Sequence, residues 1–491
     1  MLLDRLAHGF PTRLFLMLVT GLALNIPAAV WGDIVYYRLP GTNKEIILQG
    51  AVTPNSGGSM TFQHPKLGKM YFSIKETEFQ KVPTLPQQFS KQLGKAGGDA
   101  EKRYQAAQWA LRHGLLPQFY DAVDKTLEAN PQHQRATLVK KLKQRIEQPI
   151  GDSSVQEKEM RDLVGRPEMK VKMSKHFILL HDTPDKPAEN RKIPRADERL
   201  QLLEQVYESF LLRFYASGVE LEIPKDRLKV VLFSQHQDYL FFATKLDPGL
   251  ASAAGFWGHD DNTGVFYDNG TSEDFKELLD LSDDLQKEKK EAQRVRAANA
   301  ADIVRFADAL KFIVDLEREN LDIEVVSHEA THQMAGNTGL LPRDVRIPSW
   351  VHEGLATYFE APDGASWSGI GAVNADRLKW YRLLEPDREH SNIDFIVGDQ
   401  IFDYAKTHAG KVAGYGQAWA ITHFLMERHM DEFIAFYRRL GEMPPDVQLS
   451  QEILSQLFRD CIKKDPAALD AEWRAYMRGL KTDLEIILDD R

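Results

Sequence analysis

Cysteine is almost absent from this sequence of 491 residues, because Cys461 is the one cysteine in it. An intrachain disulfide is therefore impossible, and a metal site built from several cysteines is excluded. Positive charge is also in deficit, with 62 Lys and Arg against 72 Asp and Glu and a formal net charge of −10. That balance argues against nucleic acid as a partner, since binding to phosphates needs clustered basic residues.

Apolar runs long enough to span a bilayer are missing as well. Residues 14–24 form a short apolar stretch that follows Arg5 and Arg13 and precedes the small residues at 27–29. This order is typical of a secretory signal, so we expect residues 1–32 to be a signal peptide or an uncleaved signal anchor, with a buried helix as the remaining alternative. The protein is therefore expected to be exported to the periplasm, the cell envelope or the extracellular space. No integral membrane domain is expected beyond that possible anchor.

The composition of the rest, 43% hydrophobic and 27% charged, is that of a globular chain with several domains. Short β-favouring runs predict a small β module at residues 33–82. Residues 83–150 are expected to hold a linker, up to residue 98, and then two helices that resemble one tetratricopeptide-type hairpin. That hairpin is either a structural spacer or a peptide-binding repeat. The main domain is expected at 165–445, followed by a helical extension at 446–491.

The main domain alternates strand-like and helical patterns, which predicts an α+β fold. Apolar runs at 176–180 and 228–233 have the length of strands, and residues 200–215 between them have helical spacing. Residues 256–267 predict a hairpin, and residues 301–336 predict one long helix.

A possible metal site lies within that long helix, in the pattern His328-Glu329-x-x-His332. Residues four apart lie on the same face of a helix, so both imidazoles can reach one ion about 2.0–2.1 Å away. Glu329 is adjacent to the first ligand and can reach a water on the metal. The alternative is a pair of surface histidines beside a helical glutamate.

A second segment, Trp350-Val351-His352-Glu353-Gly354, follows after a loop that contains Pro342 and Pro348. Together the two segments resemble the gluzincin metallopeptidases, the clan of aminopeptidase N and thermolysin. The resemblance implies a gluzincin-like zinc peptidase domain, with a mixed-sheet subdomain and a helical subdomain. It also implies that Zn2+ is held by His328, His332 and Glu353.

A third match is Tyr415, in the sequence Tyr-Gly-Gln-Ala-Trp. In the aminopeptidase branch of the clan a tyrosine beyond the ligand glutamate donates a hydrogen bond to the developing oxyanion. The resemblance gives Tyr415 that role, and a core aromatic residue is the alternative.

A narrower resemblance covers about half of the chain, residues 170–440. This segment is similar to an uncharacterised gluzincin-like family known only as a domain of unknown function. The Gly255-Phe256-Trp257 strand, Gln333 and the helix that Tyr415 opens carry the resemblance. A Gly-Ala-Met-Glu-Asn strand, with which aminopeptidases hold a free amine, is not found here. Phe256 and Trp257 instead suggest an apolar edge strand for an extended peptide.

Two histidines and one carboxylate leave a fourth position for water, which is the composition of a catalytic zinc site. Glu329 would act as the general base, and Thr357 and Glu360 are candidates to accept a hydrogen bond from a ligand histidine. His352 is not expected to face the metal, because neighbours on a helix point about 100° apart. His259, with Asp260 and Asp261, is either a cation-binding loop or simply solvated.

The sequence therefore predicts zinc-dependent hydrolysis of peptide bonds in a peptide or protein substrate. Two alternatives stay open. One is a non-catalytic envelope protein that uses this scaffold to bind a partner. The other is a zinc hydrolase of a non-peptide amide or ester, since the same chemistry would serve it.

Overall fold

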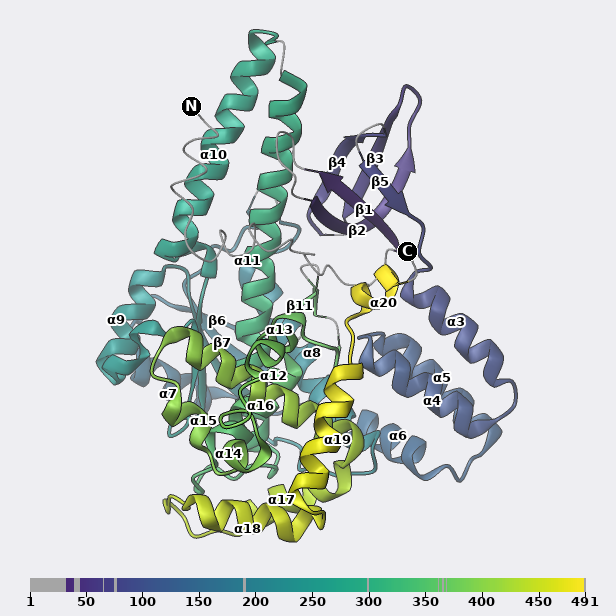
Figure 1. Cartoon of the computed structure of the whole chain (residues 1–491). Coiled ribbons are helices and arrows are strands. Elements are labelled where there is room, and N and C mark those ends of the chain that lie inside the picture. The colour runs from purple at the N-terminus through teal and green to yellow at the C-terminus, as the bar shows by residue number, and fades with distance from the viewer. Residues whose placement is uncertain are drawn as a thin grey trace. The chain divides into compact units, whose positions relative to one another are not determined.

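A computed structural model describes residues 32–38, 45–64, 66–74, 77–188, 191–297, 300–360, 362–363, 366–367 and 369–489 (Figure 1). The signal pattern at residues 14–29 lies outside the described residues. Among the helices that are described, none combines the length and the apolar character needed to cross a bilayer. The architecture is mixed α+β, as expected, with two five-stranded sheets, and the chain divides into two compact units.

The first unit is built from a five-stranded antiparallel sheet with the order β4-β3-β2-β1-β5. Side chains alternate between buried and less buried positions along β3, as in a sheet with one face on a core. The strands are β1 (Asp33–Arg38), β2 (Glu45–Pro54), β3 (Ser59–His64), β4 (Gly68–Ser73) and β5 (Thr77–Gln80).

Two long helices, α10 (Glu273–Arg294) and α11 (Ala300–Asn337), complete this unit, to which α11 contributes the residues up to Asp322. Strand residues such as Val35 and Phe62 share one core with Phe312 and Leu316 of α11. The β module therefore buries its apolar face against a helix that lies far from it in the sequence. Residues 283–296, a segment rich in charged residues of both signs, belong mostly to helix α10.

The segment expected as a linker up to residue 98 is mostly a helix, α3 (Leu85–Ala96). The prediction was wrong because Pro86 falls in the first turn, where proline is tolerated, and because Leu85 and Phe89 are buried. Three further helices follow instead of two: α4 (Ala100–Arg112), α5 (Leu116–Ala129) and α6 (Gln134–Ile146).

The second unit contains a mixed sheet with the order β6-β7-β8-β10-β9. β7, β8 and β10 are parallel, and β6 and β9 run antiparallel to their neighbours. Its strands are β6 (Lys170–Met173), β7 (Phe177–His181), β8 (Leu228–Phe233), β9 (Gly255–Gly258) and β10 (Thr263–Tyr267). The expected strands and the hairpin are confirmed, and helix α8 (Arg195–Tyr215) connects β7 to β8.

The remaining helices of this unit include α12 (Ser349–Phe359) and α16 (His408–Arg428), which pack against each other. A Cβ on Gly354 would lie 2.7 Å from the carbonyl oxygen of Ala418, so glycine permits the close approach of the two helices. Gly416 plays the same part, since a Cβ there would lie 3.0 Å from the Arg377 carbonyl oxygen of α13. These contacts bring Glu353, Tyr415 and Arg377 into one region.

The other elements are α7 (Ser154–Val164), α9 (His236–Leu246), η1 (Pro248–Ser252), η2 (Asn269–Thr271), β11 (Pro362–Asp363), β12 (Ser366–Trp367), α13 (Ala375–Leu384), α14 (Ile393–Val397), α15 (Gln400–Tyr404), α17 (Met430–Gly441), α18 (Gln451–Ile462), α19 (Pro466–Gly479) and α20 (Asp483–Asp489). The expected helical C-terminal region is confirmed. Trp473 is buried there, and Tyr476 is partly buried.

Candidate metal centre

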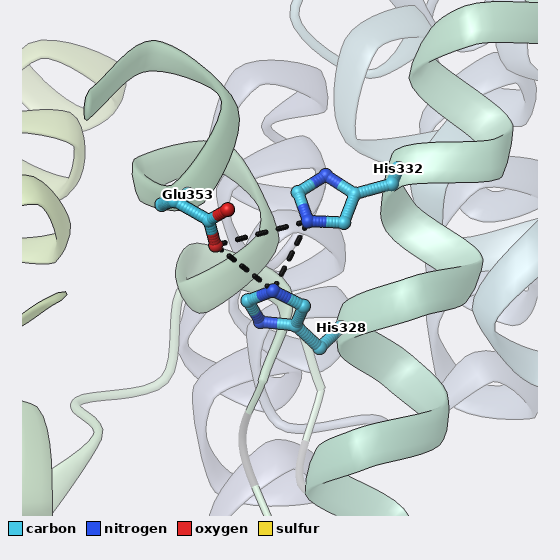
Figure 2. Close-up of side chains that lie close together, drawn as sticks. All are labelled: His328, His332 and Glu353. Carbon is cyan, nitrogen blue, oxygen red and sulfur yellow. Dashed lines mark hydrogen bonds and ion pairs between the residues drawn. The ribbon is translucent and has the colours of Figure 1, made fainter. Parts of the chain in front are cut away.

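The predicted histidine pair lies on α11, and the predicted carboxylate lies on α12. Figure 2 shows the three side chains pointing toward one another from the two helices. The Nε2 atoms of His328 and His332 are 3.0 Å apart, and Oε2 of Glu353 lies 3.0 Å from the first and 3.8 Å from the second. The structure thus brings the three residues together.

The separations suit one tetrahedral zinc ion. Ligand atoms about 2.0–2.1 Å from such an ion lie about 3.3–3.4 Å from each other, close to the mean of these three distances. Oε2 of Glu353 is also buried and is satisfied by no hydrogen bond within the described chain. Leaving a buried carboxylate oxygen without a hydrogen bond is costly, and a cation between the three atoms would remove that cost.

His328 is held in one tautomer by a buried carboxylate. Its Nδ1–H donates to Oε1 of Glu360, which leaves Nε2 free to bind a metal. Burial opposes protonation, yet the carboxylates of Glu353 and Glu360 beside the ring raise the pKa of His328 well above its usual value. The site therefore favours a positive charge, which a proton or a metal ion can supply.

Glu360 is the residue that fills the expected acceptor role, and Thr357 is not. The Thr357 hydroxyl donates to the backbone carbonyl of Glu353, 2.7 Å away, one turn back on its own helix. This is the usual hydrogen bond of a buried helical threonine, which satisfies the hydroxyl and turns it away from the imidazoles.

Arg377 on α13 supports the far side of Glu360. Its Nε and Nη2 lie 2.9 and 2.7 Å from Oε2 of Glu360, and Nη2 also lies 2.6 Å from Oε1 of Glu324. Burial raises the pKa of Glu360, but Arg377 and His328 together lower it below its usual value. Glu360 therefore stays charged, and it links α13 to helix α11.

Glu329, the predicted base, is half-buried beside the triad. Its carboxylate accepts a hydrogen bond from the backbone N–H of Trp257 on strand β9. Burial, only partly offset by His328, raises the pKa of Glu329 to about 7. A carboxyl group with a pKa close to neutral pH is suited to taking up and releasing a proton.

Tyr415 lies near the triad, on helix α16. Its ring centroid is 6.3 Å from that of His328, and the Arg377 guanidinium lies over the ring at 5.5 Å. Burial and the neighbouring Glu353 raise the pKa of Tyr415, so its hydroxyl remains a proton donor at neutral pH. The tyrosine is therefore close to the centre, as the hypothesis of an oxyanion donor requires.

Gln333 fixes the metal-binding helix to the sheet. Its Nε2 donates to the backbone carbonyls of Lys229 and Asn262, both at 3.1 Å. The amide thus connects the residue next to His332 with strand β8 and with the turn between β9 and β10. This explains structurally why a glutamine follows the second histidine.

The loop at His259 to Asp261 provides no candidate cation site in the structure. The Asp261 carboxylate accepts from the backbone N–H of Thr263 at 3.0 Å, which stabilises the turn before β10. Within the described residues, the one group of three side chains placed to hold a metal is the triad of His328, His332 and Glu353.

A cleft of about 710 Å³ opens beside the triad. Trp257, His259, His352 and Glu353 line it, together with residues from the segments 341–349, 398–403 and 446–454. Glu353 therefore belongs both to the triad and to the wall of the cleft.

Comparison with protein families finds one match in this region. Residues 322–446 match a family described as protein of unknown function (DUF1570). This segment covers about a quarter of the chain and includes every residue of the triad, Glu329, Glu360, Arg377 and Tyr415. Searches of curated proteins and of solved structures found no significant match.

Besides Arg377, the sequence argument missed one more residue of the site, His352. Its ring stacks on that of His332, with centroids 4.3 Å apart and planes at 19°, and it lines the cleft. Burial lowers the pKa of His352 and, more strongly, that of His332. Its place directly before Glu353 was the available signal, but helix geometry alone suggested that it would point away.

Proposed function

We propose that this protein is a zinc-dependent peptidase with a gluzincin-like catalytic domain. The observation that carries the proposal is the convergence of two imidazole Nε2 atoms and one carboxylate oxygen at separations of 3.0, 3.0 and 3.8 Å. Two histidines with one glutamate are a donor set of catalytic zinc sites, which keep a position open for water or substrate.

His328, His332 and Glu353 would hold the zinc. When bound, zinc lowers the pKa of a coordinated water to about 7 and polarises the scissile carbonyl. Glu329 would accept the proton of that water and pass it to the leaving amine. Tyr415 would donate its hydroxyl hydrogen to the oxygen on which negative charge develops.

A peptide or protein is the proposed substrate. The cleft of about 710 Å³ lies within the size range of ligand-binding clefts, and Glu353 is among its lining residues. Strand β9 has one neighbour in its sheet, β10, and carries Trp257, which also lines the cleft. Both features suit an extended chain. Export is proposed with the activity, on the pattern of the N-terminal residues.

Metal analysis combined with two substitutions tests the proposal. Purified protein is expected to contain about one zinc per chain. Glu329→Gln should keep the zinc but lose hydrolysis, because the amide cannot accept a proton. His332→Ala should lose both the bound zinc and the hydrolytic activity. A protein that cannot be loaded with zinc, or a Glu329→Gln variant with unchanged turnover, would contradict the proposed mechanism.

A mixed peptide library then identifies the reaction. Cuts at free N-termini only would indicate an aminopeptidase, and internal cuts would indicate an endopeptidase. Zinc-loaded protein that cleaves no peptide but hydrolyses simple esters or amides would favour the non-peptide hydrolase. Zinc-loaded protein inert to all of them would favour the binding protein.

A further inference from the structure

The two ligand histidines are held in different ways. His328 donates its Nδ1–H to Glu360, which is itself fixed by Arg377. For Nδ1 of His332, the described residues supply no hydrogen-bond acceptor. Metal-binding histidines almost always have such an acceptor, because it fixes the orientation of the ring. Any contact by which the described residues fix the ring of His332 must therefore be of another kind.

The side chain of His352 is in the position to do so. The two imidazoles are nearly parallel, at 19°, with a centroid distance of 4.3 Å that is typical of stacked rings. The indole of Trp257 is also nearly parallel to His352, at 19° and 6.2 Å. The ring nitrogens of His352 make no hydrogen bond or ion pair within the described part of the chain. Its contacts with the site are therefore made through its face.

Trp257 is in turn firmly placed. Its Nε1–H donates to Oδ1 of Asn262 at 3.1 Å, and Asn262 pairs with Asn337 of α11 at 2.8 Å. The indole also packs closely on α11, since a Cβ on Gly336 would lie 2.7 Å from it. A continuous series of contacts thus runs from α11 through Trp257 and His352 back to the second ligand on the same helix.

We propose that His352 is a positioning residue, which fixes the ring of the ligand His332 by stacking against it with support from Trp257. This rests on the proposed zinc centre. The stack replaces the hydrogen-bond acceptor that His328 has in Glu360. His352 itself neither binds the metal nor touches the reacting atoms, so what matters is the flat ring and not its nitrogens.

Three substitutions at one position separate the ring from its nitrogens. His352→Phe keeps a flat ring and removes the nitrogens. His352→Asn keeps a polar group that can donate or bind metal and removes the ring, and His352→Ala removes both. Zinc affinity is measured by competition with a chromophoric chelator, and thermal unfolding of the metal-free proteins shows whether each variant is folded. His259→Ala is the matched control, because His259 lines the same cleft without contacting His332.

His352→Ala and His352→Asn are expected to weaken zinc binding about five- to tenfold, and His352→Phe to stay within about twofold of wild type. His259→Ala should leave the affinity unchanged. Equal losses for Phe and Ala would show that a ring nitrogen is needed and would overturn the proposal, as would an unchanged affinity in His352→Ala. If His352→Ala does not fold, Trp257→Leu, which removes the support, must weaken zinc binding. Wild-type protein that binds no zinc would instead refute the proposed function, on which this inference depends.

Discussion

At the scale of single residues, Glu360 contacts the triad through His328 without belonging to it. It is buried, it receives the Nδ1–H of His328, and it balances the charge of Arg377. Partners of this kind raise the basicity of a ligand histidine and fix its tautomer. The strength of metal binding should therefore depend on the negative charge of Glu360.

Glu360→Gln tests this dependence. The amide oxygen can still accept from His328, but the charge is lost, so we expect zinc affinity to fall about 10- to 100-fold in a chelator competition. Glu427→Gln is a control that also removes a buried carboxylate paired with an arginine, Arg213, but away from the triad. It should lower stability without changing zinc affinity. Equal affinity in both variants would contradict the role of Glu360.

Tyr415→Phe tests the oxyanion donor. Removing one such donor typically reduces kcat about 100- to 1,000-fold, and zinc content and KM should change little. Tyr381→Phe is the control, because Tyr381 is a buried tyrosine whose hydroxyl has no hydrogen-bond partner in the described chain. Full activity of Tyr415→Phe would contradict the role of oxyanion donor and would show that Tyr415 contributes only packing to α16.

At the scale of elements, helix α12 presents Glu353 to the triad, and Asp399 fixes where this helix begins. The Asp399 carboxylate accepts from the backbone N–H groups of Ser349 and Trp350, at 2.8 and 2.9 Å. Asp399 itself has a left-handed backbone with φ of 59°, which asparagine and aspartate tolerate better than most residues.

Asp399→Ala should therefore destabilise the protein by about 1–3 kcal/mol, from the lost cap and the strained backbone, as measured by urea unfolding. Asp399→Asn keeps a hydrogen-bond acceptor, and asparagine tolerates the left-handed backbone, so this variant should lose much less stability. If the two variants were equally stable, capping of α12 would not be the function of this side chain.

Another contact between elements predicts how stability depends on pH. His423 of α16 donates Nε2–H to the Gly371 carbonyl and accepts from the Tyr476 hydroxyl of α19. Burial lowers its pKa from 6.5, although Glu427 acts in the opposite direction. Below pH 6.5 the unfolded chain therefore binds more protons at this residue than the folded protein does, and the free energy of unfolding falls as pH falls.

In the variant His423→Gln, the free energy of unfolding should fall less as pH falls than it does in wild type. The measurement is the free energy of unfolding of the metal-free protein at about pH 7.5 and about pH 5.5, for variant and wild type. His390→Gln is a suitable control, because His390 is half-buried in a different contact, with Asp387. The same pH dependence in wild type and His423→Gln would contradict the prediction.

At the scale of the whole molecule, the β module is separated in sequence from the helix that completes its core. Phe62 packs edge-on to Phe312 of α11, with ring centroids 5.8 Å apart. Deleting residues 33–80 would expose Phe312, Leu316 and Ala309 to water. We expect the shortened protein to aggregate, as seen by size-exclusion chromatography. A monodisperse product that still unfolds cooperatively would show that α11 does not need the module.

The sequence predicted the strands and the long helix from local periodicity, and it predicted the histidine pair from the four-residue spacing of His328 and His332. The place of Glu353 beside that pair followed from the resemblance to the gluzincins and not from any local pattern. It did not predict helix α3, where buried contacts of Phe89 outweigh the nearby glycines. The packing of the β module on α11 and the stacking of His352 on His332 could not be predicted from the sequence either. Both join residues far apart in the chain, and no local pattern encodes their distance.

The hydrogen bond between Glu329 and the backbone N–H of Trp257 has a consequence for saturation mutagenesis. Every amino acid except proline has a backbone N–H at position 257. A library of substitutions there will therefore show the effect of the indole but not the effect of the hydrogen bond to Glu329. Replacing that one amide by an ester, through chemical ligation, would remove the donor while the indole stays in place.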